Sequence, residues 1–333
     1  MPGPYIASKS KQRGSPMRTI TALFVGLGSI GTRHLKNLTN LCADRGWTLQ
    51  ADALRSDLSR PLRDGVAALL HAQYTDLADA PAHYHMVFIT NPTSLHADAL
   101  TRVRGRGGAL FIEKPIFSAD QTGLDLADCL PAGQKAYVAA PMRWCGVMLA
   151  LKDRLPGLHP YCARVICSSY LPDWRPGVDY RTVYSAHKAM GGGVTIDLIH
   201  EWDYLVELFG VPEQLYNFKG TYSDLEIDSD DLSVYIARYP TLLAEVHLDY
   251  FGRGYRRSIE LFCHDGSYLA DFGAGTLTLP DGTVQHYEED VNRRYEREME
   301  YFVDYALTGS CESCNPPALA LNVLKLTLGE NVQ

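Results

Sequence analysis

A glycine-rich turn near the beginning of the chain constrains its fold more strongly than any other feature. The apolar run of residues 20–25 leads directly into Gly26-Leu-Gly-Ser-Ile-Gly31, which predicts a buried strand that turns sharply into a helix. Gly26 permits the tight turn, Gly28 lets the backbone approach a pyrophosphate, and Gly31 allows the helix to pack closely on the strand. The helix N-terminus offers free N–H groups to the anion. The pattern favours dinucleotide binding over an ordinary glycine-rich turn, with contacts from Gly26, Gly28, Ser29, Ile30 and Gly31.

The size and the charge of the chain limit the class of protein. It has 333 residues, of which 46% are hydrophobic and 21% are charged, so it is long enough for two domains with sizeable cores. Its formal net charge of -8 is spread over interspersed acids and bases, which argues against a nucleic-acid partner. No apolar stretch reaches the roughly 18 residues of a membrane span, and the N-terminus has no apolar secretory core. We expect a cytoplasmic protein without a membrane partner, with residues 1–16 as a disordered extension.

The cysteines do not suggest a metal site. All eight are scattered through a chain without an export signal, which predicts reduced thiols. Cys311 and Cys314 have CxxC spacing, but no second pair and no Cys/His cluster accompanies them. The sequence therefore predicts no bound metal.

Short apolar segments alternate with helical patterns through the first part of the chain, at residues 48–55, 86–90, 109–112 and 136–140. This alternation predicts a doubly wound parallel sheet within a domain of residues 17–143. In such sheets ligands bind beyond the carboxyl ends of the strands. Four polar residues fall at those ends: Asn91, Glu113, Lys114 and Arg143.

The second part of the chain has a different pattern. Strand-like runs separated by turn residues predict a mainly antiparallel sheet, with helices on one face, in a domain of residues 144–310. The remaining segment, residues 311–333, is expected to form a helix that packs back on the first domain.

A second glycine cluster, at residues 191–193, precedes a helical pattern over residues 194–210. Four polar residues would lie along one face of a continuous helix, at positions i, i+3, i+4 and i+7: Asp197, His200, Glu201 and Tyr204. Polar groups on a face that looks into a cleft suggest proton chemistry. The alternative is an ordinary amphipathic helix with a solvated acidic side.

Three motifs occur in a characteristic order: the Gly26–Gly31 turn, Glu113-Lys114-Pro115, and the glycines at 191–193 that lead to Asp197 and His200. With this order and spacing the chain resembles the glucose-fructose oxidoreductase and inositol dehydrogenase (Gfo/Idh/MocA) family from residue 17 onwards. The resemblance implies an α/β protein with an N-terminal Rossmann domain and a C-terminal α/β domain that has an open, mostly antiparallel sheet. It also implies reversible oxidation of a sugar-like secondary alcohol by a nicotinamide cofactor, in a homo-oligomer such as a dimer or tetramer.

The resemblance also implies roles for residues at the strand ends. Lys114 would lie beside the nicotinamide and hydrogen-bond the reacting oxygen, while Glu113 and Pro115 would shape the turn, with a cis peptide before the proline. The cofactor would also be lined by Thr90, Asn91, Pro92, His96, Glu113 and Arg143.

The proton acceptor is the point at which this sequence departs from many members of the family. Their catalytic His comes four residues after the Asp, whereas here that position is Glu201 and His200 comes three residues after Asp197. The segment instead resembles a branch with the pattern Asp-x-x-His-Glu-x-Asp-Tyr. We expect His200 to be the general base, oriented by Asp197, with Glu201 as the alternative. An ammonium group such as that of Lys114 would stabilise the developing alkoxide.

The tip of the second predicted strand indicates the type of nicotinamide cofactor. An acid there binds the adenosine ribose of NAD, whereas an Arg with a small hydroxyl residue accommodates the 2′-phosphate of NADP. With the second strand over residues 48–55, Arg55 and Ser56 lie at the tip, which favours NADP. A strand that ends at Asp52 would favour NAD instead.

A loop rich in aromatic and basic residues precedes the second glycine cluster. Aromatic faces stack on sugar rings and Arg side chains bind carboxylate or phosphate, so the loop predicts an acidic sugar or sugar nucleotide as the substrate. The expected substrate contacts are Lys114, Arg143, Trp174, Arg175, Tyr180, Arg181, Tyr184, Asp197 and His200. The alternative is a structural loop whose arginines pair with Asp173 and Asp179. A catalytically silent, dinucleotide-binding regulatory protein of the same fold is the alternative function.

Overall fold

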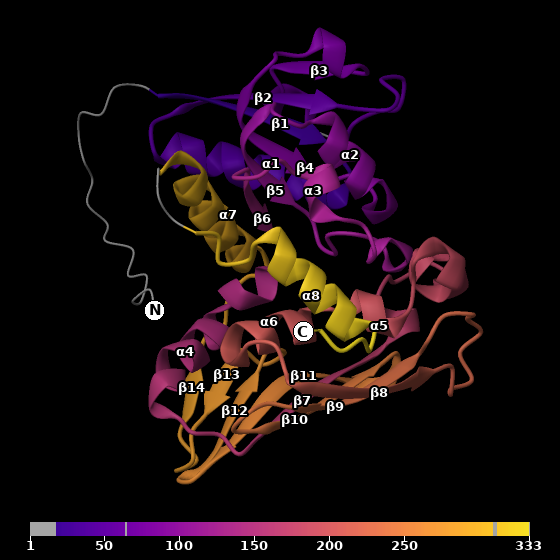
Figure 1. Cartoon of the computed structure of the whole chain (residues 1–333), viewed down its shortest axis with the longest axis vertical. Coiled ribbons are helices and arrows are strands. Elements are labelled where there is room, and N and C mark those ends of the chain that lie inside the picture. Colours follow the sequence, from indigo (N-terminus) through magenta and orange to yellow (C-terminus); the bar gives the residue numbers. More distant parts are fainter. Residues whose placement is uncertain (1–17, 64, 309–311, 333) are drawn as a thin grey trace. The chain divides into compact units, whose positions relative to one another are not determined.

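The computed structural model describes residues 18–63, 65–308 and 312–332 and divides into two compact units (Figure 1). Within the described residues, unit 1 draws on Met1–Glu113, Asp125–Ala139 and Tyr295–Pro316, and unit 2 on Lys114–Leu124, Ala140–Arg294 and Pro317–Gln333. The predicted N-terminal extension and Cys311 lie outside the described residues. No helix in the described part of the chain is both long and apolar enough to cross a bilayer.

Unit 1 is built on a parallel sheet of six strands in the order β3-β2-β1-β4-β5-β6, which confirms the predicted doubly wound fold. The strands are β1 (Thr19–Val25), β2 (Thr48–Leu54), β3 (Ala72–Tyr74), β4 (Tyr84–Ile89), β5 (Gly107–Ile112) and β6 (Lys135–Val138). The helices of this unit are α1 (Ser29–Asp44), α2 (His96–Arg102), α3 (Leu126–Cys129) and most of α7 (Asn292–Leu307). The chain reverses its direction of winding between β1 and β4, and in such sheets ligands bind at that point.

Aromatic side chains fill the core of unit 1. The rings of Phe24 and Phe88 stack with centroids 4.4 Å apart, and Phe111 stacks on Phe88 at 5.3 Å. Phe302 of α7 meets both Phe88 and Phe111 edge-on, at 5.4 and 5.1 Å. This aromatic contact makes α7 an integral part of unit 1.

The last helix, α8 (Pro317–Thr327), groups with unit 2, whereas the sequence led us to expect it with the first domain. It packs on α5 (Val194–Asp197) and α6 (His200–Phe209) of unit 2, and the Tyr235 hydroxyl donates a hydrogen bond to the Thr327 carbonyl at 2.6 Å. Both terminal helices are amphipathic in sequence. The aromatic residue Phe302 is what fits α7, rather than α8, to the aromatic core of unit 1.

Unit 2 contains an open sheet of eight strands in the order β14-β13-β12-β11-β7-β10-β9-β8. Neighbouring strands are antiparallel except for β10 and β7, which agrees with the predicted mostly antiparallel sheet. The strands are β7 (Cys162–Tyr170), β8 (Gln214–Gly220), β9 (Leu232–Arg238), β10 (Leu243–Asp249), β11 (Phe251–Cys263), β12 (Gly266–Asp271), β13 (Thr276–Thr278) and β14 (Val284–His286). Within this unit α4 (Gly146–Arg154), α5 (Val194–Asp197) and α6 (His200–Phe209) lie on one face of the sheet (Figure 1).

The predicted helix over residues 194–210 is divided into α5 and α6. Leu198 has φ −98° and ψ 31°, outside the helical region, and α6 begins at His200. The break changes the direction of the chain between Asp197 and His200. The polar residues of the segment therefore do not share one continuous helix face, as the periodicity predicted.

Candidate functional site

The first glycine cluster of unit 1 has the geometry of a phosphate-binding turn. Gly26 has φ +90°, and a Cβ atom there would lie 2.8 Å from the Asn91 Cα atom. A Cβ atom on Gly31 would lie 2.6 Å from the Gly26 carbonyl oxygen, whereas one on Gly28 would meet no atom within 4 Å. No side chain caps the N-terminus of α1. The open space at Gly28 leaves room for a pyrophosphate at this helix N-terminus, so the expected phosphate site stays a prediction.

A hydrogen bond joins the residue after β4 to this turn. The Thr90 hydroxyl donates a hydrogen bond to the Gly26 carbonyl at 2.6 Å, and the His96 Nε2 atom lies 3.0 Å from the Asn91 carbonyl oxygen. Asn91 Nδ2 donates to the Leu95 carbonyl at 3.2 Å, which leaves its buried Oδ1 atom without a hydrogen-bond partner in the described residues. The strand end therefore keeps a buried acceptor next to the glycine turn.

The tip of β2 bears on the choice of cofactor. The strand ends at Leu54, so Arg55 and Ser56 follow at its carboxyl end. Asp52 is 3% exposed and accepts a hydrogen bond from the Tyr84 hydroxyl at 2.8 Å. Its carboxylate is therefore directed into the protein. Arg55 is steadied by a hydrogen bond from Nη1 to Gln73 Oε1 at 2.8 Å.

Glu113 at the end of β5 has a partner that the sequence analysis did not identify. Its Oε1 atom lies 2.5 Å from the Nε2 atom of the fully buried His34 in α1. The peptide bond between Lys114 and Pro115 is cis, as the resemblance implied. The position of His34, one turn after Gly31, is the sequence signal that could have revealed it.

In unit 2, two of the predicted catalytic residues, Lys114 and His200, interact electrostatically. His200 is the first residue of α6 and is only partly buried. Its pKa is held well below the ordinary value, first by desolvation and then by the positive charges of Lys114, Arg257 and Arg294. The imidazole is consequently neutral near pH 7 and can accept a proton.

Asp197 lies at the end of α5 and binds two tyrosines. It accepts hydrogen bonds from the Tyr184 hydroxyl at 2.7 Å and from the Tyr250 hydroxyl at 2.6 Å. No hydrogen bond joins Asp197 to His200 in the part of the chain that the structure describes, so the expected orientation of His200 by Asp197 is not found. The break at Leu198 explains this difference, since it separates the two residues.

Tyr250 was not among the predicted site residues, although it connects several of them. Its ring meets Trp174 edge-on with centroids 5.2 Å apart, and its hydroxyl binds Asp197. On the other side of Asp197, the Arg175 guanidinium lies 5.7 Å from the centre of the Tyr184 ring. Three predicted residues, Trp174, Arg175 and Tyr184, are thus linked to the carboxylate of a fourth, Asp197.

Glu201, the alternative proton acceptor, is fully buried. It binds Arg257 with both oxygens, at 2.7 and 3.1 Å. Tyr204 is also fully buried and packs its ring on Phe272 with centroids 5.3 Å apart. These contacts give both residues a structural role in the core and argue against Glu201 as the base.

Two of the predicted substrate-binding arginines are engaged by carboxylates of the protein itself. Arg143 is 2% exposed and binds Asp203 through Nε at 2.9 Å and Nη2 at 2.7 Å. Arg181 binds Asp179 and Glu226, at 2.9 and 2.7 Å. The structural alternative for the loop therefore fits Arg181, and the buried Arg143 has no exposed guanidinium for a cofactor or substrate.

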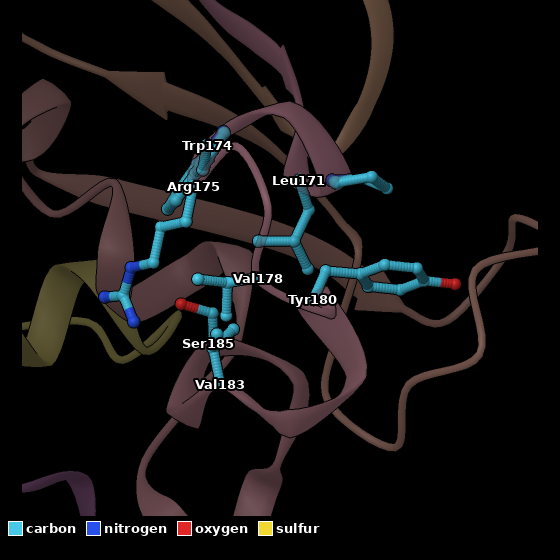
Figure 2. Close-up of a pocket in the computed structure, with 8 residues that line it drawn as sticks. Leu171, Trp174, Arg175, Val178, Tyr180, Val183 and Ser185 are labelled. Atoms are coloured by element: carbon cyan, nitrogen blue, oxygen red, sulfur yellow. The ribbon is translucent and has the colours of Figure 1, made fainter.

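A small pocket lies within the aromatic loop between β7 and α5, and Figure 2 shows its lining. Leu171, Val178 and Val183 form its apolar part. The Arg175 guanidinium and the Tyr180 hydroxyl project at opposite ends of the group (Figure 2). The Tyr180 hydroxyl accepts a hydrogen bond from the Glu226 backbone N–H at 3.2 Å. No group of His, Cys, Asp and Glu that could hold a metal occurs among the described residues.

Comparison with known proteins identifies the fold. Residues 20–138 match the family model GFO_IDH_MocA, described as "Oxidoreductase family, NAD-binding Rossmann fold". Levoglucosan dehydrogenase in complex with NADH and levoglucosan is 15% identical, with a TM-score of 0.77 over 94% of this chain and 96% of that one. No curated protein sequence matches this chain significantly.

Two further solved structures share the fold. The WlbA dehydrogenase from Bordetella pertussis, in complex with NADH and UDP-GlcNAcA, is 18% identical, with a TM-score of 0.71 over 94% of this chain and 95% of that one. GenD2 from gentamicin A biosynthesis, in complex with NAD, is 19% identical, with a TM-score of 0.73 over 96% of this chain and 95% of that one. Both units of the chain are therefore similar to parts of known dehydrogenases.

Proposed function

We propose that the chain is an NAD(P)-dependent sugar oxidoreductase, because residues 20–138 match the model of an oxidoreductase family with an NAD-binding Rossmann fold. It would transfer a hydride between the nicotinamide and a secondary alcohol or ketone of a sugar, preferably an acidic sugar or a sugar nucleotide. Two similar structures support this class, since one contains levoglucosan and another contains UDP-GlcNAcA. We further propose a homo-oligomer, which light scattering of the full chain would test.

The observation that carries the proposal is the position of the partly exposed His200 at the start of α6, where desolvation and then the positive charge of Lys114 lower the pKa of its imidazole. When the alcohol is oxidised, the Lys114 ammonium stabilises the developing alkoxide and His200 Nε2 or Nδ1 accepts the hydroxyl proton. In the reverse direction His200 returns the proton to the oxygen. The nicotinamide supplies the hydride acceptor or donor when it is bound.

Unit 1 has the residues that such a cofactor needs. Gly28 and the N-terminus of α1 would hold the pyrophosphate, and Asn91 Oδ1 is a buried acceptor beside them. We propose NADP as the preferred cofactor because Arg55 follows the tip of β2 whereas Asp52 is buried. Titration with NADPH and NADH, followed by nicotinamide fluorescence, tests that preference.

The residues around Asp197 would bind the sugar. Trp174 offers an aromatic face, and Tyr184 is held by Asp197 while carrying the Arg175 guanidinium over its ring. An aromatic face with hydrogen-bonding side chains beside it suits a sugar ring.

The test is a panel of sugars, sugar acids and sugar nucleotides assayed with NADP and NAD. We expect turnover with at least one acidic sugar, and a loss of about 100- to 10,000-fold in Lys114→Met and His200→Asn. NADPH binding should stay within about twofold in both variants, and the exposed His159→Asn is the matched control. Tight NADPH binding without turnover of any sugar would contradict the enzyme and support the regulatory alternative.

A further inference from the structure

Arg294, a half-buried residue near the beginning of α7, differs from Arg143 and Arg257 of unit 2 in its partners. Arg143 binds the carboxylate of Asp203 and Arg257 binds that of Glu201, so each of these charges is balanced. Arg294 Nη1 instead contacts the Met142 Sδ atom at 2.8 Å. Its buried Nε atom has no hydrogen-bond partner, and no carboxylate pairs with it among the described residues.

This arrangement is unfavourable in free energy for the ligand-free protein. A partly buried guanidinium without an acidic partner loses part of its hydration and gains only a weak contact with a thioether. An anion that pairs with this guanidinium would replace the lost hydration, which would favour binding of the anion. A guanidinium without an acidic partner does little to stabilise the fold. Its presence near the catalytic residues is therefore more readily explained by binding of an anionic ligand.

Local packing connects Arg294 to the catalytic residues of unit 2. Met142 lies in the 3-10 turn Pro141–Trp144, and the next residue, Arg143, binds Asp203 of α6. This turn packs on α6, the helix that begins with His200. The charge of Arg294 accordingly acts on His200, as do the charges of Lys114 and Arg257.

We propose that Arg294 is the anion-binding residue of the catalytic site and binds a carboxylate of the substrate beside Lys114 and His200. The inference rests on the proposed function and narrows its substrate to a sugar acid. A guanidinium fork binds both oxygens of a carboxylate, for which its planar donors are well suited. Arg294 takes the role that the sequence suggested for Arg143 and Arg181, whose guanidinium groups are bound to protein carboxylates.

Calorimetric titration of the NADPH-loaded protein tests the proposal with matched pairs of ligands: D-glucuronate and D-glucose, D-galacturonate and D-galactose, and D-gluconate and D-glucitol. In at least one pair we expect the acid to bind about 10- to 100-fold more tightly than the neutral sugar. Arg294→Gln should abolish that advantage without changing the affinity for the neutral sugar. Arg238→Gln, which changes an exposed arginine of β9, should keep it.

Arg294→Lys is the second variant, in case Arg294→Gln does not fold. It keeps the charge but loses the fork, so the acid should bind several-fold more weakly while the neutral sugar is unaffected. An acid preference that survives in both variants, or a wild-type protein that prefers no acid, would overturn the inference. Failure of the proposed function is distinguishable, because it would appear as absent NADPH binding or absent hydride transfer with every sugar.

Discussion

The two glycine clusters of the chain resemble each other in sequence and differ in their surroundings. At Gly28 of the first cluster a Cβ atom would meet nothing within 4 Å. At Gly192 of the second it would lie 2.0 Å from the Tyr184 carbonyl oxygen, and at Gly193 it would lie 2.3 Å from Asp230 Oδ1. The space beside Gly28 is thus open, whereas the protein itself fills the space beside Gly192 and Gly193.

The difference teaches that two glycine clusters of one chain can have different roles: binding is the role we propose for the first, whereas the second serves the construction of unit 2. Gly193 has φ +131° and precedes α5, whose Thr195 backbone N–H donates to Asp230 at 2.9 Å. The close approach at Gly192 brings the Tyr184 segment against the start of α5. Asp197 at the other end of α5 then receives the Tyr184 hydroxyl. The second cluster acts on the site through the backbone.

The largest effect is expected for Gly192→Ala. The new methyl group would overlap the backbone carbonyls of Tyr184 and Ser185, so the loop must move. We expect the free energy of unfolding to fall by about 3 kcal/mol, measured by urea denaturation. Gly157→Ala is the control, because a Cβ atom there meets nothing within 4 Å. Equal stability of the two variants would refute the constructive role of the second cluster.

Gly28→Val tests the opposite role of the first cluster. A Cβ atom at this position meets nothing within 4 Å among the described residues, so we expect the free energy of unfolding to change by less than about 1 kcal/mol. The same side chain would occupy the space proposed for the pyrophosphate, and NADPH affinity should fall by about tenfold or more. Unchanged NADPH affinity in fluorescence titration would remove the distinction between the clusters.

Arg55→Ala tests the proposed contact of unit 1 with the 2′-phosphate of NADP, and its expected effect is smaller. Loss of the guanidinium should weaken NADPH binding by about tenfold, since a charge-assisted hydrogen bond to the 2′-phosphate is lost. NADH affinity should remain within about twofold. If the wild-type protein already prefers NADH, the proposed role of Arg55 is wrong.

The smallest expected effect is a shift of a pH profile in unit 2. Alcohol oxidation requires neutral His200, so its rate should fall only at pH below the ordinary His pKa of about 6.5, because the His200 pKa is lowered. Arg294→Gln removes a positive charge and should raise that pKa, which moves the acidic limb of kcat/KM to higher pH. If the acidic limb of the kcat/KM profile stays at the same pH in this variant, the charge of Arg294 does not act on His200.

The features of unit 1 were predictable because they depend on local sequence. Alternating apolar segments define the parallel strands, and the carboxyl ends of those strands must meet at one edge, which brought Asn91 and Glu113 into the prediction. The placement of Arg55 followed from the length of β2 alone. His34 was missed because its role depends on contact with Glu113, 79 residues away.

The catalytic part of unit 2 was less predictable, because it depends on contacts between residues that are distant in sequence. Helical periodicity put Glu201 on the face of His200, but the break at Leu198 and the distant Arg257 make it a buried ion pair. Tyr250 and Arg294 come from segments far from α5 and α6 in sequence. No local pattern indicates that their side chains act on Asp197 and His200.

The central claim is that the partly exposed His200, and not the buried Glu201, accepts the proton. The most direct measurement compares kcat for sugar oxidation in His200→Asn and Glu201→Gln, using the substrate found in the sugar panel, with stability measured in parallel. We predict a loss of at least about 100-fold in kcat for His200→Asn with little change in unfolding, and mainly a loss of stability for Glu201→Gln. Near-normal turnover in His200→Asn, with turnover abolished in a stably folded Glu201→Gln, would contradict the account.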